Sequence, residues 1–452
     1  MEPFARHIFV CTQEKPEGVT CCPASGSMSV LGALHGELGR QGLSGEVQVS
    51  SCGCLGLCDE GPIMITYPEG VWYRKVKPED VPEIVSAHLR NGKIVSRLQW
   101  NDAPAMKEMA TEHTRQYLAM VKAKDEAGTL PDNLFEITRS FMPSRALLTA
   151  LELDIFTAVG SGSSAEKVAR NIHADARATE MLLNVLASLK LLDKRDETFS
   201  NTANSSRFFA AGSPDNAQPG LLHIAHIWHN WSNLTECVRT GTAVPKARRE
   251  SDWTRDFIAA MDYNAKDRAD AVVKAVGTDG VKRVLDLGGG SAAYSIAFVR
   301  AVPGLTSEIL DLADVVPLTQ KYIQQAGLAD RITTRVGDML RDPLGDNYDL
   351  ILILAICHMF SPEEVRDLFK RAHRALAPKG RLVVQDFILD PSKTAPRAAA
   401  LFSLNMLVGT QAGSSYSEPE YSAWMQEAGF QEVKRVRLPG PSGLMIGMRP
   451  SA

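Results

Sequence analysis

The stretch RVLDLGGGSAAYSIAFVRAVPG, residues 283–304, decides the fold of the C-terminal part of this chain. A short apolar run leads into consecutive glycines, and a segment with helical spacing of apolar residues follows. This order predicts a strand, a glycine loop and a helix. Asp286 stands at the end of the strand. Gly288, Gly289 and Gly290 carry no side chain, so a ligand can approach their backbone closely.

Strands and helices keep alternating after the glycine loop. Further segments that predict strands lie at 307–312, 332–340, 348–360, 380–390, 432–440 and 443–450. Alternation of this kind predicts an α/β fold in which helices cover both faces of a parallel, doubly wound sheet. Ligands of such sheets bind at the carboxyl ends of the strands.

Acidic residues end three successive strands of the predicted sheet. Asp286 ends the first, Asp311 lies 25 residues further on, and Asp338 ends the third. A carboxylate at Asp311 can accept hydrogen bonds from two ribose hydroxyls, and Asp338 can meet the edge of an adenine. The loop lacks the GxGxxG spacing of dinucleotide sites, which disfavours NAD. The series of acids therefore predicts an adenosyl cofactor.

Residues 163–202 have the order helix, turn, helix and two short strands, which is typical of a winged helix-turn-helix. This pattern raises the rival hypothesis of a redox-sensing transcription factor. The recognition helix, at about residues 176–191, carries cations only at its ends, Arg177 and Lys190. A DNA reader needs several Lys and Arg contacts to phosphates. The mostly apolar helix favours packing on another helix instead, and we expect no nucleic acid partner.

Residues 130–450 resemble the S-adenosylmethionine-dependent O-methyltransferases of the dimeric acetylserotonin and caffeate type. The resemblance rests on LDLGGG (285–290), on the acidic strand ends and on ICHMFSPEEVRDLF (356–369), and it includes the winged-helix part. It implies a homodimer that uses S-adenosylmethionine. It also implies contacts of the methionine part with Gly288, Gly289 and Gly290, of the ribose with Asp311 and Leu312, and of the adenine with Asp338 and Met339.

The same resemblance implies a general base. His358 falls on the base at the family's catalytic strand end, and Asp386 falls on the acid that orients it. A neutral imidazole, with an ordinary pKa of about 6.5, can take a hydroxyl proton, and a carboxylate on its other nitrogen fixes the tautomer. Two positions depart from the family pattern: Ala292 replaces the last glycine of the loop, and Ser415 replaces a second catalytic acid. The structural alternative for His358 is a polar cap on a buried strand.

Two segments carry candidates for the acceptor pocket. The candidates are Phe402, Asn405 and Met406 in one segment and Trp228 and Trp231 in the other. Residues of this kind also form ordinary cores, so both interpretations stay open. His223, His226 and His229 accompany the tryptophans at steps of three, which is compatible with pocket lining, a metal site or plain packing. The expected acceptor is a hydroxyl of a flat, mostly apolar small molecule, and sulfur, nitrogen and carbon acceptors stay open.

The first hundred residues form a separate pattern that is rich in cysteine. Six of the eight cysteines lie here, namely Cys11, Cys21, Cys22, Cys52, Cys54 and Cys58. The expected order of strand, helix, strand, hairpin and helix resembles thioredoxin. In a reducing compartment, clustered cysteines indicate ligands or redox groups rather than structural disulfides. Four thiolates can hold a [2Fe–2S] cluster, and nearby glycines let backbone N–H groups approach the sulfurs.

Residues 5–97 resemble the thioredoxin-like [2Fe–2S] ferredoxins. The matching motifs are HIFVC (7–11), CPASGS (22–27), GCLGLCDEGPIMITYPEGVWY (53–73) and VKPEDVPEIVSAHL (76–89). The resemblance implies cluster ligation by Cys11, Cys22, Cys54 and Cys58. A four-cysteine zinc site and a dithiol redox site are alternatives, which the absence of any CxxC pair disfavours. A domain that has lost its cluster is a third alternative.

The domain organisation that follows is a fusion. We expect a ferredoxin domain at 1–100, a linker at 101–130, a winged-helix dimerisation domain at 131–270 and a methyltransferase domain at 271–452. Methyl transfer is redox-neutral, so the cluster would gate the enzyme, serve a redox partner protein, or feed electrons to an adenosyl-dependent hydroxylation.

Bulk properties agree with such an enzyme. The net charge of −4 gives no general reason to bind nucleic acid. No apolar run has the length of a membrane span, and the sequence MEPFARHIFV has no signal-peptide pattern. We therefore expect a cytoplasmic protein that has no membrane partner.

Overall fold

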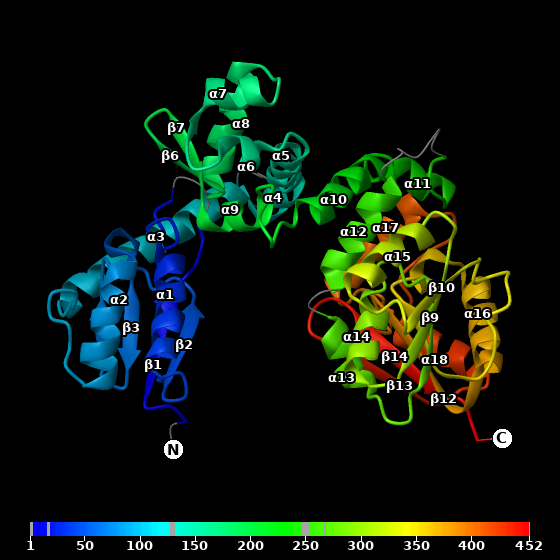
Figure 1. The fold of residues 1–452 in the computed structure, drawn as a ribbon. Helices are drawn as coiled ribbons and strands as arrows, with labels where there is room; N and C mark the ends of the chain where they lie inside the picture. The colour runs from blue at the N-terminus through cyan, green and yellow to red at the C-terminus, as the bar shows by residue number, and fades with distance from the viewer. Residues whose placement is uncertain (1–2, 16–18, 127–131, 246–252, 266–267, 452) are drawn as a thin grey trace. The chain divides into compact units, whose positions relative to one another are not determined.

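The structure is a computed structural model of the 452-residue chain. It describes all residues except 1–2, 16–18, 127–131, 246–252, 266–267 and 452. The chain forms two compact units, Met1–Phe141 and Met142–Ala452 (Figure 1). Each unit has its own apolar core, so each is described by itself.

The first unit is built on a four-stranded sheet. Its strands are β1 (Arg6–Cys11), β2 (Val47–Cys52), β3 (Met64–Tyr67) and β4 (Val71–Tyr73), in the order β2-β1-β3-β4. β1 and β2 are parallel, whereas β3 is antiparallel to β1 and to β4. The sheet packs against α1 (Ser27–Arg40) and against the continuous helix of α2 (Val81–Glu83) and η3 (Ile84–Arg90). Short 3-10 turns, η1 (Cys58–Glu60) and η2 (Pro78–Asp80), complete this part.

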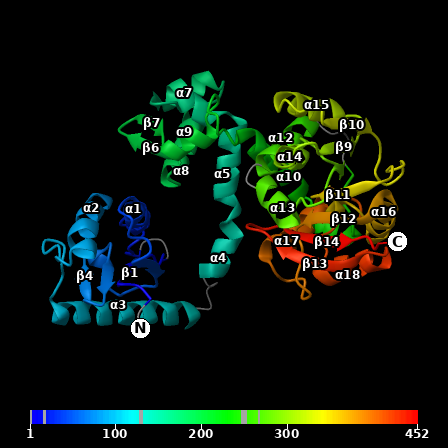
Figure 2. The ribbon, with the colours of Figure 1, turned by 60° about the horizontal axis from the view of Figure 1, so that its bottom comes forward.

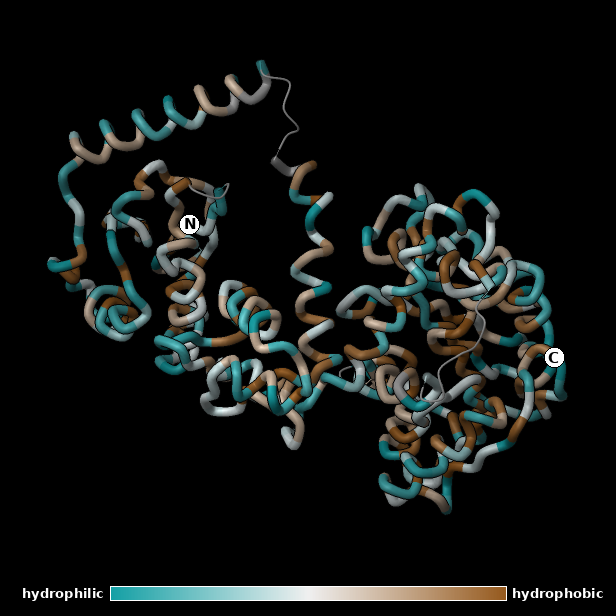
Figure 3. Tube along the Cα trace, turned by 90° about the horizontal axis from the view of Figure 1, so that it is seen from above, coloured by the Kyte–Doolittle hydropathy of each residue, from teal (hydrophilic) through white to brown (hydrophobic). Residues whose placement is uncertain are grey.

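The expected linker forms a long helix, α3 (Ala103–Glu126), which α4 (Asp132–Arg139) follows. Figure 3 shows α3 alternating between hydrophilic and moderately apolar residues without a continuous hydrophobic stripe. The first turns of α3 nevertheless bury apolar side chains, because Met106, Met109 and Ala110 pack against a small core that contains Cys11 and Cys22. α3 therefore covers the cysteine loops.

The second unit begins with a winged-helix part. Its elements are α5 (Phe141–Glu152), α6 (Ile155–Val159), β5 (Ser163–Ser164), α7 (Ala165–Asn171), α8 (Ala176–Ser188), β6 (Leu192–Arg195), β7 (Thr198–Asn201) and α9 (Ala203–Phe209). The three strands form a sheet in the order β5-β7-β6. Asp175 caps α8 by accepting a hydrogen bond from Ala178 N–H at 2.8 Å. Leu183 and Leu186 of α8 are fully buried in the local core, so this helix packs inside the protein as its apolar sequence predicts.

Between the winged-helix part and a large sheet, the described residues form four helices. They are α10 (Gln218–Trp231), α11 (Leu234–Thr240), α12 (Trp253–Ala265) and α13 (Ala269–Val276). The sheet contains β8 (Arg283–Leu287), β9 (Thr306–Asp311), β10 (Ile332–Val336), β11 (Tyr348–Leu354), β12 (Leu376–Asp386), β13 (Gln431–Arg437) and β14 (Gly443–Met448). Their order is β10-β9-β8-β11-β12-β14-β13.

The sheet is doubly wound as expected, but one edge of it is antiparallel. β8 to β12 are parallel, but β14 is antiparallel to both β12 and β13. The short connection between β13 and β14 explains the difference, because a parallel pair needs a crossover of a dozen residues or more, whereas a hairpin does not.

Helices cover both faces of this sheet, as Figure 2 shows. α16 (Pro362–Ala375) and α18 (Glu418–Glu427) bury their apolar sides on one face, and α13, α14 (Ala293–Ala301) and α15 (Val316–Gln325) do so on the other. α17 (Arg397–Gly409) contacts α10 and α11, and η4 (Cys357–Met359) is a 3-10 turn after β11. Within the described part of the chain, no helix combines the length and apolarity that a membrane span requires.

Candidate active site

The glycine loop after β8, called the glycine cradle below, packs so closely on its neighbours that side chains at Gly288 and Gly289 would collide with them. Gly288 adopts φ 71°, and a Cβ on it would lie 3.0 Å from both Ile356 Cγ1 and Met339 Cε. A Cβ on Gly289 would lie 2.9 Å from Asp286 Oδ2, which no real Cβ tolerates. The loop therefore presents bare backbone at the carboxyl end of β8.

Two buried carboxylates hold the loop in shape. Asp311 Oδ2 accepts a hydrogen bond from Gly290 N–H at 2.9 Å, and Oδ1 accepts one from Leu312 N–H at 2.7 Å. Asp286 Oδ2 accepts a hydrogen bond from Ser295 Oγ at 2.7 Å. Burial raises the pKa of Asp286 to about 7, and burial also raises the pKa of Asp311. The carboxyl groups of Asp286 and Asp311 are thus buried beside the glycine loop.

Ala292 occupies the position of the loop's usual last glycine. It adopts φ 65° and is completely buried. The left-handed conformation is therefore retained although the residue has a side chain, at a conformational penalty of about 1–2 kcal/mol. Ala292 therefore differs from the family's glycine but keeps the same backbone turn.

The remaining adenosyl candidates lie at the ends of the next strands. Leu312 follows β9 and its side chain is 57% exposed, so it is open to contact with a ligand. Asp338 accepts a hydrogen bond from Leu340 N–H at 2.9 Å, while its own N–H donates to Asp342 Oδ2 at 2.7 Å. The structure thus brings these residues and the glycine loop to one edge of the sheet, and bare backbone beside ordered carboxylates fits an adenosyl group.

His358 and Asp386 form a buried pair next to this edge. His358 Nδ1 lies 2.7 Å from Asp386 Oδ1, and His358 N–H donates to Oδ2 at 3.1 Å. The two residues are 6% and 1% exposed. His358 does not lie on the strand itself, because β11 ends at Leu354 and His358 sits in the 3-10 turn η4. An ionised carboxylate is only an acceptor, so Nδ1 carries the ring proton and Nε2 keeps a lone pair.

Aromatic rings lie against this imidazole. The Phe402 ring of α17 meets the His358 ring edge to face at 4.8 Å, and Phe387 stacks on Phe402 at 3.9 Å. Trp231 Nε1 donates to Asn405 Oδ1 at 2.9 Å, which ties α10 to α17. Met406 is only 8% exposed and has little surface to offer to an acceptor.

The other ring side chains of this segment contact residues of neighbouring helices. Arg145 lies 5.9 Å from the centre of the Trp228 ring. The His223 ring packs edge to face against Phe257 at 5.2 Å and against Trp253 at 6.3 Å. Across the part of the chain that the structure describes, no three His, Cys, Asp or Glu side chains are arranged to hold a metal ion. The metal interpretation of these histidines has no support.

Two further residues that the sequence did not predict lie against the His358–Asp386 pair. Tyr421 on α18 is fully buried, and its hydroxyl donates to Asp386 Oδ2 at 2.7 Å. A Cβ on Gly413 would lie 2.3 Å from the backbone oxygen of His358. Both contacts join residues that are far apart in the chain, so no local sequence pattern predicts them.

In the first unit, the four cysteines of the ferredoxin motif lie in two pairs. Cys54 Sγ and Cys58 Sγ are 3.5 Å apart. Cys11 and Cys22 share a hydrogen bond, which lowers the pKa of Cys11 to about 6 and raises that of Cys22. Burial raises the pKa of Cys58 to about 11. The described side chains do not close around one point as a metal site would.

Hydrogen-bond donors contact two of these cysteine sulfurs, and the backbone of Gly61 lies close to a third. Gly56 N–H donates to Cys54 Sγ at 3.3 Å, and Lys15 Nζ donates to Cys58 Sγ at 3.1 Å. A Cβ on Gly61 would lie 2.9 Å from Cys22 Sγ. Cys52 pairs with Cys11 across β1 and β2, and burial raises the pKa of Cys52.

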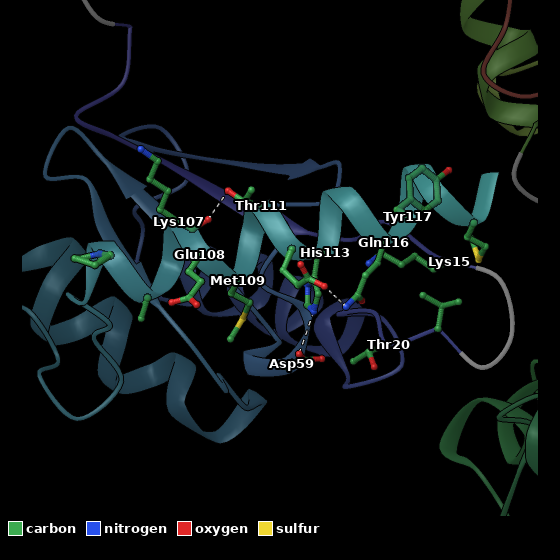
Figure 4. Close-up of a pocket in the computed structure, with 15 residues that line it drawn as sticks. Lys15, Thr20, Asp59, Lys107, Glu108, Met109, Thr111, His113, Gln116 and Tyr117 are labelled. Carbon is green, nitrogen blue, oxygen red and sulfur yellow. Dashed lines mark hydrogen bonds and ion pairs between the residues drawn. The ribbon is translucent and has the colours of Figure 1, made fainter. Parts of the chain in front are cut away.

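A pocket of about 1250 Å³ runs along α3 beside these loops. Figure 4 shows its residues, with His113 reaching Asp59 Oδ2 through Nε2 at 3.0 Å. His113 Nδ1 also lies 2.8 Å from Gly56 O, so one side chain joins α3 to the cysteine loop. The lining residues all belong to the first unit.

In the second unit, a doubly wound sheet, a glycine cradle, acidic strand ends and a His–Asp pair define a methyltransferase that uses an adenosyl cofactor. An O-methyltransferase domain model matches residues 225–431, and an O-methyltransferase dimerisation domain model matches residues 135–211. Neither of these two models reaches residues 1–134.

Individual proteins agree with these models. The chain is 31% identical to 3-hydroxy-5-methyl-1-naphthoate 3-O-methyltransferase of Streptomyces sahachiroi over 71% of this chain and 95% of that protein. An O-methyltransferase family protein of Burkholderia thailandensis has a TM-score of 0.66 at 26% identity, covering 72% of this chain and 99% of that one. PigF with SAH also has a TM-score of 0.66 at 26% identity, over 71% and 99%. The chain belongs to the S-adenosylmethionine-dependent O-methyltransferases and carries their dimerisation domain.

Proposed function

We propose that this enzyme methylates a hydroxyl of a small aromatic or polycyclic metabolite, with His358 as general base. The observation that carries the proposal is the 2.7 Å contact between His358 Nδ1 and Asp386 Oδ1 beside the glycine cradle. The name of the Streptomyces sahachiroi relative places methylation on a phenolic oxygen of a naphthoate, which supports the same class of acceptor.

The proposed cofactor site lies at the carboxyl ends of the parallel strands. The residues that would hold S-adenosylmethionine are Gly288, Gly289 and Gly290 for the methionine part, Asp311 and Leu312 for the ribose, and Asp338 and Met339 for the adenine. When bound, this cofactor supplies an electrophilic methyl group. The chain's task is then to align and deprotonate the acceptor oxygen.

The side chains near His358 suit that task. Asp386 orients the imidazole so that Nε2 can take the hydroxyl proton, and the carboxylate stabilises the imidazolium that forms. The stacked rings of Phe387 and Phe402 offer a flat apolar surface against which an aromatic acceptor can pack. Trp231 and Asn405 form the neighbouring wall of the proposed pocket.

A panel of acceptors tests this assignment. The protein is incubated with S-adenosylmethionine and separately with hydroxynaphthoates, catechols, thiophenols and aromatic amines, and products are followed by mass spectrometry. We expect methylated oxygen in the hydroxylated aromatic compounds. Methylation of the thiols or amines alone would reject the hydroxyl assignment.

We further propose that the enzyme is a homodimer built through the dimerisation domain. Large apolar side chains at the start of this domain are exposed in the single chain, namely Leu134, Phe135, Ile137, Phe141 and Met142. Such a concentration is unusual on a free surface and suits a partner surface. We retain 131–270 as the proposed extent of the dimerisation domain, between a linker at 101–130 and a methyltransferase domain at 271–452.

For residues 1–100, which form part of the first unit, we propose a thioredoxin-like ferredoxin domain. We propose that it binds a [2Fe–2S] cluster through Cys11, Cys22, Cys54 and Cys58. The donor set fits in kind. Cys11 ends β1, Cys58 begins η1, and Cys22 and Cys54 lie in loops. Backbone approaches the sulfurs of Cys54 at Gly56 and of Cys22 at Gly61. The strand order β2-β1-β3-β4 is compatible with the thioredoxin-like resemblance. Methyl transfer is redox-neutral, so we propose that the cluster gates the enzyme or serves a redox partner protein.

Spectroscopy of protein purified without oxygen tests the cluster. We expect visible absorption that bleaches with dithionite, a reduced EPR signal, and equal iron and sulfide. Cys22→Ser should abolish these signals, whereas Cys21→Ser is the matched control that should retain them. A colourless protein, or one that holds zinc, would reject the cluster. Methyl transfer in both redox states then tests the gating role.

A further inference from the structure

Asp386 is a buried carboxylate whose acceptor positions are all in use. Oδ1 accepts hydrogen bonds from His358 Nδ1–H at 2.7 Å and from Phe387 N–H at 2.8 Å. Oδ2 accepts one from His358 N–H at 3.1 Å and one from the Tyr421 hydroxyl at 2.7 Å. A carboxylate offers about four acceptor sites. Tyr421 therefore supplies the last donor, and it is the only side chain besides His358 among the described donors.

Tyr421 is held rigidly for this contact. It lies in the first turn of α18, where Ser417 and Glu420 form a capping box. Its ring is fully buried and packs edge to face against Tyr416 at 5.9 Å and Trp424 at 5.8 Å. Burial and the nearby Asp386 charge raise the pKa of Tyr421 well above its usual value, so the hydroxyl stays a neutral donor.

We propose that Tyr421 is a positioning residue for methyl transfer, whose hydroxyl fixes the orientation and charge distribution of Asp386 and thereby sets the basicity of His358. The proposal rests on the assignment of His358 as the base. A donor on Oδ2 draws negative charge away from the carboxylate. Without this donor, the carboxylate stabilises the imidazolium more strongly, so His358 stays protonated to higher pH and is a base in fewer molecules at neutral pH.

The other groups near His358 and Asp386 do not mask the effect of the Tyr421 hydroxyl on His358. Cys357 belongs to the same turn as His358, and burial raises its thiol pKa well above the usual value, so it stays neutral. Tyr416 donates its hydroxyl to Phe360 O rather than to the carboxylate. From α17 the Phe402 ring meets the imidazole. Among the described residues, no Lys or Arg forms an ion pair with Asp386, whose one ionic contact is with His358.

Tyr421→Phe tests the proposal, and Tyr416→Phe is its matched control. Each variant removes one buried phenolic hydroxyl, but only the first hydroxyl touches Asp386. The full-length protein is labelled with ¹³C at the histidine rings, and the His358 signal is assigned with His358→Asn. In Tyr421→Phe we expect the midpoint of the His358 titration to rise by about 0.5 pH unit, the order of effect of one hydrogen bond on a neighbouring titration. In Tyr416→Phe it should stay in place.

This readout needs no acceptor, so it separates the proposal from the proposed substrate class. With 3-hydroxy-1-naphthoate as probe, Tyr421→Phe should also lower kcat about tenfold while KM is unchanged, as for loss of one hydrogen bond to a charged group. If the wild-type protein does not methylate this probe, the acceptor class is wrong and the titration still decides the role of Tyr421. Equal midpoints in the wild type and Tyr421→Phe, or an equal shift in Tyr416→Phe, would overturn the proposal.

Discussion

At the scale of single residues, the carboxylate of Asp311 links the glycine loop to the proposed ribose site. Each of its oxygens already accepts one backbone hydrogen bond, and these bonds set its orientation. Asp311→Ala removes both the loop contact and the ribose acceptor. We expect S-adenosylmethionine affinity to fall tenfold or more, since a hydrogen bond to a charged group contributes about 1.5–3 kcal/mol.

Isothermal titration calorimetry with S-adenosylmethionine checks this expectation. Asp314→Ala, which changes a carboxylate three residues away that accepts neither of these bonds, serves as the control. Unchanged affinity in Asp311→Ala would remove this residue from the cofactor site.

Asp286 gives the fold a pH dependence. Burial raises its pKa in the folded protein to about 7, above the ordinary value of 3.8. Between these values the folded protein keeps a proton that the unfolded chain loses, so the stability contributed by the neutral acid falls as pH rises through this window. Asp286→Asn keeps an acceptor for Ser295 Oγ and cannot ionise. We expect the melting temperature of the variant relative to wild type to increase from pH 5 to pH 8.

Thermal denaturation at several pH values measures this difference. Ser295→Ala removes a hydrogen bond that lowers the pKa of Asp286 and keeps the acid, so it should lose stability with rising pH as the wild type does, up to a pH at least as high. Parallel curves for wild type and Asp286→Asn would show that Asp286 does not titrate in this range.

The acidic strand ends of the candidate site could be predicted from the sequence. Asp286, Asp311 and Asp338 end consecutive strands, and parallel strands end at one edge, so a purely local reading places them together. Tyr421 could not be found in this way, because its partner Asp386 lies 35 residues earlier and their meeting depends on how α18 packs on the sheet. Likewise, helical spacing groups Phe402 with Met406 but does not reveal that the Phe402 ring meets the His358 ring.

At the scale of elements, the connection from α17 to α18 is clamped on the turn that carries His358. Gly413 N–H donates to Thr410 Oγ1 at 2.9 Å, and a Cβ on Gly413 would lie 2.3 Å from His358 O. Gly413→Ala must push this loop off the catalytic turn. We expect a destabilisation of about 1–3 kcal/mol, typical of overpacking, together with reduced turnover.

Denaturant unfolding and turnover check this prediction. Gly409→Ala is the matched control, because its Cβ would come no closer than 4.0 Å to Asn230 Nδ2. A Gly413→Ala protein as stable and active as the control would mean that the loop adapts freely.

Elements were predictable where their pattern is local. The central strands β8, β11 and β12 contain apolar runs. α16 and α18 each begin after a serine that stands three residues before a glutamate, Ser361 with Glu364 and Ser417 with Glu420, and the structure shows both as capping boxes. The reversed direction of β14 was not predictable from the apolar run Gly443–Met448, since strand direction depends on the connection and on the neighbour. The 3-10 turn at His358 was hidden in the same way, inside a continuous apolar run that the sequence analysis took as one strand.

At the scale of the whole molecule, the exposed apolar side chains of α4 and α5 bear on assembly. Ile137 is 65% exposed, which is unusual for an aliphatic residue unless a partner covers it. Ile137→Asp places a charge in the proposed subunit interface, so we expect the dimer to dissociate. Light scattering after size-exclusion chromatography measures the mass of each species.

Arg300→Asp on the exposed side of α14 is the control for an added acid, and it should remain dimeric. A monomeric wild-type protein, or an Ile137→Asp protein that remains fully dimeric, would remove α4 from the interface.

The measurement that tests the central claim most directly is methyl transfer by His358→Ala under saturating S-adenosylmethionine, with the best acceptor of the panel. We expect turnover to fall by about two orders of magnitude or more, as for loss of a general base, while cofactor binding is unchanged. His35→Ala, in an exposed position of α1, should retain wild-type turnover. Turnover close to wild type in His358→Ala would contradict the account, because positioning alone would then drive the reaction.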